Sequence, residues 1–469
     1  MTTGNEIEVT DNLLGDGAQG RVYEGRYNGS ICAIKRLPKH AYQSTRLSNE
    51  IEVWKECKHK NLVQYFTYRD ITIENYPFTD IVLELCDGSL DEFIKEPVRK
   101  SFNNKFTKKG IMFDVALGLK YLHSKDIVHK DIKPENIMLS NPSVLAKLTD
   151  FGISKVIDPD TSSFDITSAC TRLWAAPELL DIHRHDSQCK KNIDVFSLGL
   201  VYYYTQTGLH LFGSGEDCVA NIITGRHADI SSTLPENYIF QDLLQSMIQQ
   251  DYNERSSSVD VVNHPYFWDG DKCMNLVQMI KDKIGTSSNV EGTIIVTKFN
   301  TNKCDVLGSD DWREMLEQNV KRYLANEANK TYEGSFIDLI YCITNTFEQL
   351  SGMPVEIKRF FGSTMDDVNK YTEYWFRKFP KLLIWLYHNR GTAVENSSIG
   401  PNYSPIRHSS LPSIPVSPAT LKNKSMTDPN DTNSVSHSFA QINITNTDES
   451  DTDTIDDDEP IQLTSIPGW

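Results

Sequence analysis

The hydrophobic pattern changes character once along the first part of the chain. Short β-rich runs separated by Gly and Asn come first, the clearest being Gly20–Tyr27 and Ile31–Leu37, and such runs predict strands. From about Leu90 to Trp268 apolar residues recur at three-to-four spacing, as in Phe113–His123, which predicts helices. A β-rich part followed by an α-rich part predicts two lobes with a cleft between them.

The remainder of the chain divides into two further parts. Residues 271–390 are helical in pattern and rich in aromatic side chains, as in Tyr371–Tyr387, which predicts a second, small all-α domain. After Gly391 the chain is rich in Ser, Thr, Pro, Asn and Asp and has few large apolar residues. Such a composition cannot bury enough apolar surface to fold, so residues 391–469 are predicted to form a disordered tail.

Amino-acid composition and net charge argue against several classes of protein. The 469 residues are 39% hydrophobic and 24% charged, with a formal net charge of −17. This charge argues against a non-specific nucleic-acid binder but leaves a local basic groove open. The tail holds much of that charge, with eleven acidic residues and three basic ones. Nine scattered cysteines without a Cys-x-x-Cys pair predict reduced thiols and no zinc site. A polar amino terminus and the lack of a long apolar stretch predict a cytoplasmic protein without a membrane span.

A glycine-rich run near the amino terminus is the first candidate binding element. Gly15, Gly17 and Gly20 lie in it, and Val22 follows; glycines let backbone amides approach phosphates closely, and Val22 would lie against an adenine ring. Leu14 is counted with them as a nucleotide-binding position. The same run could be a dinucleotide-binding turn or a plain glycine hairpin, although no βαβ unit follows it. Alone, the run leaves the kind of site open.

A lysine follows the glycine run at strand spacing. Lys35 ends the sequence Cys-Ala-Ile-Lys and can reach the α- and β-phosphates of a nucleotide. Glu50, in a helical segment, is its expected ion-pair partner. Ala33 beside it is counted with the predicted nucleotide-binding positions. By themselves, Lys35 would be read as a surface lysine on a strand edge and Glu50 as a solvated helix residue.

The segment Ile127–Asn136 has the order of a catalytic loop for phosphoryl transfer. Asp131 would accept the proton of a substrate hydroxyl, and Lys133 would neutralise charge on the γ-phosphate. Asn136 and Asp150, the latter in Asp-Phe-Gly, would hold Mg²⁺ against the phosphates.

Further motifs complete an ordered set that resembles the protein kinases. Ala176-Pro177-Glu178 closes the activation segment, Arg255 is placed to pair with Glu178, and Asp194 would brace the catalytic loop. The resemblance implies a bilobal α+β fold over residues 7–268, with a small lobe at 7–85 and a large lobe at 86–268. It also implies ATP and Mg²⁺ as cofactors, a protein substrate, and a segment between the lobes in which Glu84 and Cys86 bind the nucleotide.

Two details of these motifs bear on specificity and control. Lys133, two residues after Asp131, resembles serine/threonine kinases more than tyrosine kinases, in which arginine is usual. Lys130 stands where the family has an arginine that binds an activation-loop phosphate, and lysine binds it less well. Candidate phosphorylation sites in this loop are Ser162, Ser163, Thr167, Ser168 and Thr171; the alternative is that the loop is simply polar.

The motifs after the kinase, in their order, resemble the kinase-extension nuclease domain of the inositol-requiring enzyme family. They are Asp311-Trp312-Arg313, Tyr332-Glu333-Gly334-Ser335, Phe360-Phe361-Gly362-Ser363 and Arg377–Leu383. That family comprises the unfolded-protein-response sensors, with ribonuclease L as a relative, and the resemblance covers about residues 7–390. It implies a kinase that dimerises and phosphorylates itself in trans, with nuclease domains that the dimer aligns on RNA.

The nuclease chemistry implied by the resemblance is incomplete in this chain. Tyr332 and Asn345 match the family's tyrosine and asparagine, but Thr344 stands at its arginine position and Gln349 at its histidine position. Glutamine does not titrate, so it cannot act as a general acid. Threonine cannot supply a cationic fork to a phosphate. We therefore predict that RNA cleavage is weak or absent.

Three hypotheses remain open at this point. The first is an active serine/threonine kinase whose nuclease-like domain supports a homodimer; the second is a dual kinase and endoribonuclease that cleaves RNA stem-loops. The third is a nucleotide-binding scaffold that pairs with a full-length family member, although retained Lys35, Asp131 and Asp150 argue against it. The family's lumenal and transmembrane parts are not found, so the chain is either a cytosolic paralogue, which a family partner could recruit to the endoplasmic reticulum membrane, or an incomplete gene product.

Overall fold

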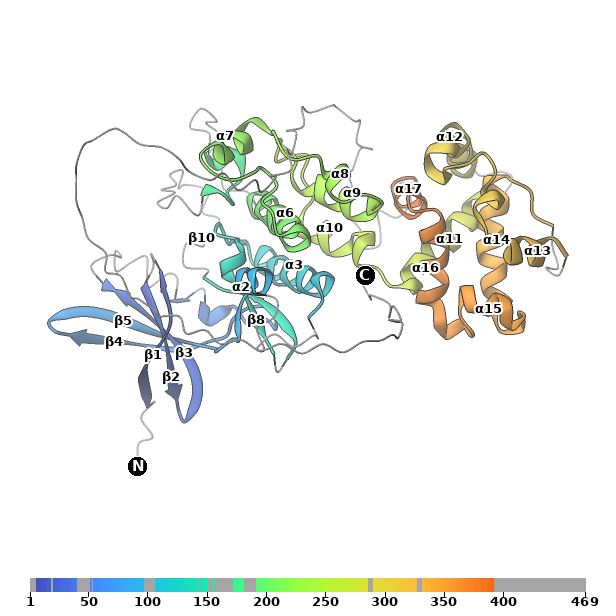
Figure 1. Ribbon diagram of the computed structural model, residues 1–469. Coiled ribbons are helices and arrows are strands. Elements are labelled where there is room, and N and C mark those ends of the chain that lie inside the picture. Colours follow the sequence, from blue (N-terminus) through green and yellow to red (C-terminus); the bar gives the residue numbers. More distant parts are fainter. Residues whose placement is uncertain are drawn as a thin grey trace, which may run out of the picture. The chain divides into compact units, whose positions relative to one another are not determined.

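The structure is a computed structural model, and it describes eleven stretches of the chain (Figure 1). These are residues 6–17, 20–39, 51–52, 54–96, 106–141, 143–150, 155–156, 172–180, 191–285, 290–326 and 331–391. Glu50, the five candidate phosphorylation sites and the predicted tail lie outside the described residues.

The first lobe is an antiparallel sheet of five strands. Its order is β1 (Ile7–Gly17), β2 (Gly20–Tyr27), β3 (Ser30–Pro38), β5 (Tyr76–Leu83) and β4 (Tyr65–Ile73). The turn between β2 and β3 is Asn28-Gly29, and both residues have positive φ, 50° and 81°. Asn-Gly tolerates this conformation, which suits a tight hairpin.

Alternation along β3 and β5 gives the sheet two different faces. Ile34 and Val82 are fully buried on one face, in a small cluster with Cys32. Their neighbours Ala33 and Ile81 point to the other face and join the main core, which continues into the large lobe. The period of two along a strand explains this division.

The second lobe is mainly helical and carries short strands around the catalytic loop (Figure 1). Its elements are β6 (Gly88–Ser89), α2 (Leu90–Lys95), α3 (Lys108–Ser124), β7 (Ile127–Val128), the 3₁₀ helix η2 (Pro134–Asn136), β8 (Ile137–Ser140), β9 (Leu145–Leu148), β10 (Lys155–Val156), α5 (Pro177–Leu180), α6 (Asn192–Thr207), α7 (Asp217–Thr224), α8 (Ile230–Thr233), α9 (Tyr238–Met247), α10 (Ser258–Asn263) and the 3₁₀ helix η4 (Pro265–Phe267).

Helix α6 is the central helix of this lobe. Thirteen of its residues are buried, from Ile193 to Thr205 without interruption, so the helix is enclosed on all sides, and most of these residues are apolar or aromatic. Gly199 allows a close approach, because a Cβ there would lie 2.9 Å from the side chain of Ile248 and 3.1 Å from that of Met247. The helix ends at Gly208, which adopts the left-handed conformation (φ 71°).

The extension domain is a helical unit with its own core. Its elements are α11 (Gly270–Gly285), α12 (Val290–Leu307), η5 (Trp312–Met315), α13 (Gln318–Asn326), α14 (Phe336–Glu348), η6 (Leu350–Gly352), α15 (Val355–Phe361), η7 (Met365–Asp367), α16 (Val368–Lys378) and α17 (Leu382–His388). Helix α11 contacts α12, α14, α16 and α17. Fully buried aromatic rings fill the centre, with Trp375 stacked on Phe361 at 5.7 Å.

The α+β class, with a sheet lobe followed by helices, is confirmed. The aromatic-rich segment Tyr371–Tyr387 forms two helices, because α16 ends at Lys378 and α17 begins at Leu382. Pro380 explains the break, since the residue before a proline is disfavoured in helical conformation and Phe379 has ψ 75°. Among the described helices, none is both long enough and apolar enough to cross a bilayer.

A shared carboxylate joins the large lobe to the extension domain. Asp242 on α9 lies 3.0 Å from Nε2 of His264 and 2.8 Å from Nε2 of His388 on α17. The Tyr266 amide donates to Nδ1 of His264, so Nε2 carries the proton and donates to Asp242. Burial opposes the ionised form of Asp242, but the two histidine hydrogen bonds outweigh it and lower the pKa to about 2.

This joint is expected to weaken in mild acid. Burial lowers the pKa of His264 although Asp242 attracts the proton. A folded pKa below the unfolded value near 6.5 gives stability that is present above pH 6.5 and lost as pH falls through the folded value. The thermal midpoint should therefore fall from pH 7.5 to 5.5, and a His264→Asn variant should lose less over this range.

A second variant tests the carboxylate directly. Asp242→Asn should lower the midpoint at pH 7.5 by roughly 2–6 °C, because an amide can accept from only one of the two histidines. Asp305→Asn, which removes an exposed partner of Lys381, is the matched control and should change the midpoint little. Equal shifts in the two variants would contradict the assignment.

Candidate active site

Two side chains of the catalytic loop, those of Asn136 and Lys133, hold Asp131 through three contacts. Asn136 donates its amide to the backbone oxygen of Asp131 (2.8 Å) and to Oδ2 (2.9 Å), and Nζ of Lys133 lies 2.8 Å from the same Oδ2. Oδ1 of Asp131 is buried and has no hydrogen-bond partner within the described part of the chain. An ionised oxygen buried without a partner is costly, and a substrate hydroxyl would satisfy it.

A second aspartate fixes the backbone of this loop. Oδ2 of Asp194 accepts the amide of His129 and Oδ1 accepts that of Lys130, both at 2.8 Å. His123 also lies against Oδ2, at 2.9 Å. Lys130 has φ 69°, an uncommon conformation for a lysine, so these bonds hold a strained backbone just before Asp131. The bracing role predicted for Asp194 is observed.

Lys35 and Asp150 form the other half of the site. Nζ of Lys35 lies 2.5 Å from Oδ1 of Asp150, and the lysine is buried. Burial opposes ionisation of Asp150, yet the attraction of Lys35, with smaller contributions from His129 and Lys133, leaves its pKa below the ordinary value. Asp150 therefore stays ionised at neutral pH, although the partner predicted for Lys35 was Glu50, which lies outside the described residues.

The donor atoms at this end of the site fit a magnesium ion. The Asn136 amide nitrogen is committed to Asp131, which leaves its carbonyl oxygen to face a cation. The Thr149 amide donates to the Asn136 backbone oxygen at 3.0 Å, so Asn136 lies beside the strand end that carries Asp150. One carboxylate and one amide oxygen, completed by phosphate oxygens, are what Mg²⁺ prefers.

The glycine-rich run is the hairpin between β1 and β2. Gly17 pairs with Gly20, and Gly15 with Val22. Gly20 has φ 137°, and a Cβ there would lie 2.3 Å from the Arg36 backbone oxygen; only glycine fits. Gly15 has open space around its Cα, which leaves room for a phosphate to approach its backbone, while Leu14 is exposed beside it.

Glu84 and Cys86, the two predicted nucleotide-binding residues between the lobes, have different surroundings. The Glu84 carboxylate lies 2.6 and 2.8 Å from Nζ of Lys147, and it accepts a hydrogen bond from the backbone amide of Gln64 at 3.2 Å. Glu84 is therefore available to a nucleotide through its backbone rather than its carboxylate. Cys86 is only partly exposed, and burial raises the pKa of its thiol to about 12, so it remains a neutral side chain. Ala33 is buried on β3.

The activation segment ends in a buried ion pair. Arg255 binds Glu178 through two parallel contacts of 2.6 and 2.7 Å, and its guanidinium also donates to the Gln249 backbone oxygen. This is the pair expected from the sequence.

The contacts of the catalytic loop and of the Lys35–Asp150 pair form one site. It contains Asp131, Lys133, Asn136, Lys35 and Asp150.

The nuclease-like positions lie apart from this site, in the extension domain. Asn345 donates to the Tyr332 hydroxyl at 3.2 Å, so the two matching residues are together. Burial raises the pKa of Tyr332, partly offset by that bond. Thr344 is only 2% exposed, and its hydroxyl bonds the Ile340 and Tyr341 backbone oxygens. Gln349 caps the end of α14 and is half-buried.

Comparisons with known proteins agree with this geometry. Residues 9–267 match the family model of the protein kinase domain, and residues 273–404 match that of ribonuclease 2-5A. The chain belongs to the protein kinase family. Its two domains in this order place it in the inositol-requiring enzyme branch.

The relatives of this kinase share both domains at moderate identity. The sensor for unfolded proteins in the ER ire1 of Schizosaccharomyces pombe is 29% identical over an alignment of 422 residues, and the match covers 82% of this chain and 38% of that protein. The human serine/threonine-protein kinase/endoribonuclease IRE2 is 30% identical over 411 residues (84% and 42%), and Caenorhabditis elegans ire-1 is 27% identical over 404 residues (82% and 40%). The kinase thus spans about two-fifths of the length of these relatives.

Two residues of the kinase site were not identified from the sequence. His123 lies in the last turn of α3 with no motif around it, and only the fold brings it to Asp194. Lys147 is the single polar residue of β9, Leu-Ala-Lys-Leu. A lysine inside a short apolar strand is a usable signal, since a buried lysine needs an anionic partner; the sequence does not say that the partner is Glu84.

Proposed function

We propose that this kinase transfers the γ-phosphate of ATP, with Mg²⁺, to serine or threonine hydroxyls of protein substrates, including a second copy of itself. The observation that carries the proposal is the unpartnered, buried Oδ1 of Asp131, held by Lys133 and Asn136. Protein kinases as a family use ATP and Mg²⁺. The serine/threonine specificity is supported by Lys133 and by the names of the relatives.

In this mechanism each side chain has one task. Asp131 accepts the hydroxyl proton and aims the oxygen at the phosphorus. Lys133 offsets the negative charge that develops on the transferred group. Bound Mg²⁺ supplies charge neutralisation of the phosphates, and Asn136 and Asp150 would hold it. Lys35 would bind the α- and β-phosphates while it keeps Asp150 in place.

The nuclease-like domain is proposed to cleave RNA weakly or not at all. Thr344 is packed into the core, so this position presents no cation, and Gln349 cannot donate a proton near neutral pH. The retained bond between Asn345 and Tyr332 favours the second candidate, a dual kinase and endoribonuclease. Weak or absent cleavage is better supported. Of the four nuclease positions, Thr344 and Gln349 lack a side chain that can perform the family's chemistry.

We infer the dimeric state and the cellular location of the kinase from its relatives. A homodimer would bring one activation segment to the other protomer's Asp131, and the names of the relatives include a sensor in the endoplasmic reticulum. We infer that the kinase acts in the cytoplasm, next to that membrane when a family partner recruits it. The extension domain would then serve mainly as a dimer support.

Lys35→Ala tests the nucleotide site. The variant should bind ATP about tenfold or more weakly and lose phosphoryl transfer by at least about 100-fold, because Asp150 and the phosphates lose their common cation. Titration with ATP and phosphoamino-acid analysis of the labelled protein measure the two. Lys39→Ala, whose lysine pairs with Asp70 at the surface, is the matched control. Wild-type protein that fails to bind ATP, or equal losses in both variants, would overturn the proposal.

A further inference from the structure

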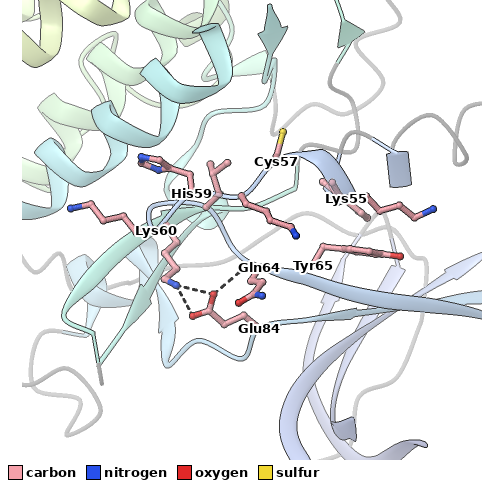
Figure 2. Close-up of a pocket in the computed structure, with 11 residues that line it drawn as sticks. Lys55, Cys57, His59, Lys60, Gln64, Tyr65 and Glu84 are labelled. Atoms are coloured by element: carbon pink, nitrogen blue, oxygen red, sulfur yellow. Dashed lines mark hydrogen bonds and ion pairs between the residues drawn. The ribbon is translucent and has the colours of Figure 1, made fainter. Parts of the chain in front are cut away.

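A cavity of ≈ 320 Å³ lies where the two lobes join, and an ion pair lines it. Figure 2 shows Glu84 beside Gln64, with its bonds marked. The partner cation is Lys147, which is 8% exposed, and both of its contacts to Glu84 are short. Glu84 belongs to the segment that links the lobes, whereas Lys147 belongs to β9.

The two halves of this pair are also joined through a third segment. Residues 61–64 bond β9 on one side, through the Val63 amide to Leu148 (2.9 Å) and the Leu148 amide to Asn61 (2.9 Å). On the other side the Glu84 amide donates to the Gln64 backbone oxygen at 2.8 Å. The ion pair thus adds a side-chain link between β9 and Glu84, which backbone hydrogen bonds through residues 61–64 already align. It also fixes the position of the Glu84 carboxylate.

Strand β9 leads directly to the metal-binding end of the site. Asp150 follows Lys147 by three residues and is paired with Lys35. A nucleotide must contact the Glu84–Cys86 segment with its base and the Asp150 end with its phosphates, so the distance between these two ends has to fit it. The Lys147–Glu84 pair links them, because Glu84 lies at one end and Lys147 lies three residues before Asp150 at the other.

We propose that Lys147 is a positioning residue for nucleotide binding, which acts by holding Glu84 and so the backbone of the segment between the lobes. The inference rests on the proposed nucleotide site. The other lysines that line the cavity are unlike it: Lys58 and Lys60 are exposed, and Lys55 pairs with Glu52 at the surface. Removal of a buried partner strands a charge, whereas an exposed lysine is replaced at little cost.

The test is a set of variants assayed for ATP affinity and turnover. Lys147→Met should raise the Kd and KM for ATP roughly 3- to 30-fold and leave kcat at saturating ATP within about twofold, because ground-state binding is what it supports. Lys147→Arg should stay close to wild type. The charge-exchanged double variant Lys147→Glu/Glu84→Lys should recover most of the affinity and also serves if Lys147→Met does not fold. Lys60→Met is the matched control.

The outcomes separate this inference from the kinase assignment. Unchanged ATP affinity in folded Lys147→Met, an equal change in Lys60→Met, loss of kcat at constant Kd, or no recovery in the double variant would each overturn it. A wild-type protein without ATP binding would instead overturn the proposed function. A Kd increase at constant kcat that the double variant reverses supports the positioning role, since a general loss of folded protein would also lower the turnover measured at saturating ATP.

Discussion

Asp131→Asn is expected to lose phosphoryl transfer by a factor of about 10³ or more while ATP binding survives. The amide keeps the size of the carboxylate, and its carbonyl oxygen still accepts from Lys133 and Asn136 in place of Oδ2, so these two side chains keep their places. It cannot take up a proton, and general-base contributions are of order 10²–10⁴. The unpartnered Oδ1 becomes an amide group, which no longer attracts a hydroxyl proton.

This expectation is measured by single-turnover transfer at saturating ATP, with the ATP Kd determined on the same preparation. Asp126→Asn is the matched control: this aspartate lies just before β7 and pairs with Lys191 at the surface. Its loss should leave both quantities unchanged. Transfer retained by Asp131→Asn would show that another group accepts the proton and would remove the base from the proposed mechanism.

The second large effect is expected in RNA cleavage. The wild-type protein should cut a labelled RNA stem-loop at least about 10⁴-fold more slowly than a relative named as an endoribonuclease, assayed in parallel. A missing cationic stabiliser accounts for roughly 10²–10³ and a missing general acid for roughly 10²–10⁴. Of the described histidines, His388 in the extension domain is engaged by Asp242, so it supplies no substitute acid.

Restoring variants test the reason for the defect. Gln349 is half-buried at the end of α14, so Gln349→His should fold normally. Thr344→Arg is harder, because the threonine is packed and its hydroxyl bonds the helix backbone, so the arginine must leave the core and should lower the thermal midpoint. The double variant should gain cleavage, and added Tyr332→Phe should abolish the gain. Efficient cleavage by wild type would overturn the proposal and support the dual enzyme.

Much of the kinase site could be predicted because its chemistry is local. Asp131, Lys133 and Asn136 lie within six residues, and one short loop and the turn η2 bring them into contact. The strands β2 and β3 were predictable because a period of two and an Asn-Gly turn are local properties as well. The break between α16 and α17 has a local cause as well, because Phe379 precedes Pro380.

The long-range contacts were decided by the tertiary structure. Lys147 and Glu84 are 63 residues apart, and Asp242 and His388 are 146 apart; no spacing rule relates such pairs. The burial of Thr344 likewise depends on which face of α14 packs against the core, and this face decides whether the position can present a cation at all. By itself, the sequence predicted the two domains and the phosphoryl-transfer residues, and its resemblance to a known family predicted the two missing nuclease groups, because side-chain chemistry is written residue by residue. Only the tertiary structure decided how these groups are held, because partners far apart in the chain meet through the packing of whole strands and helices.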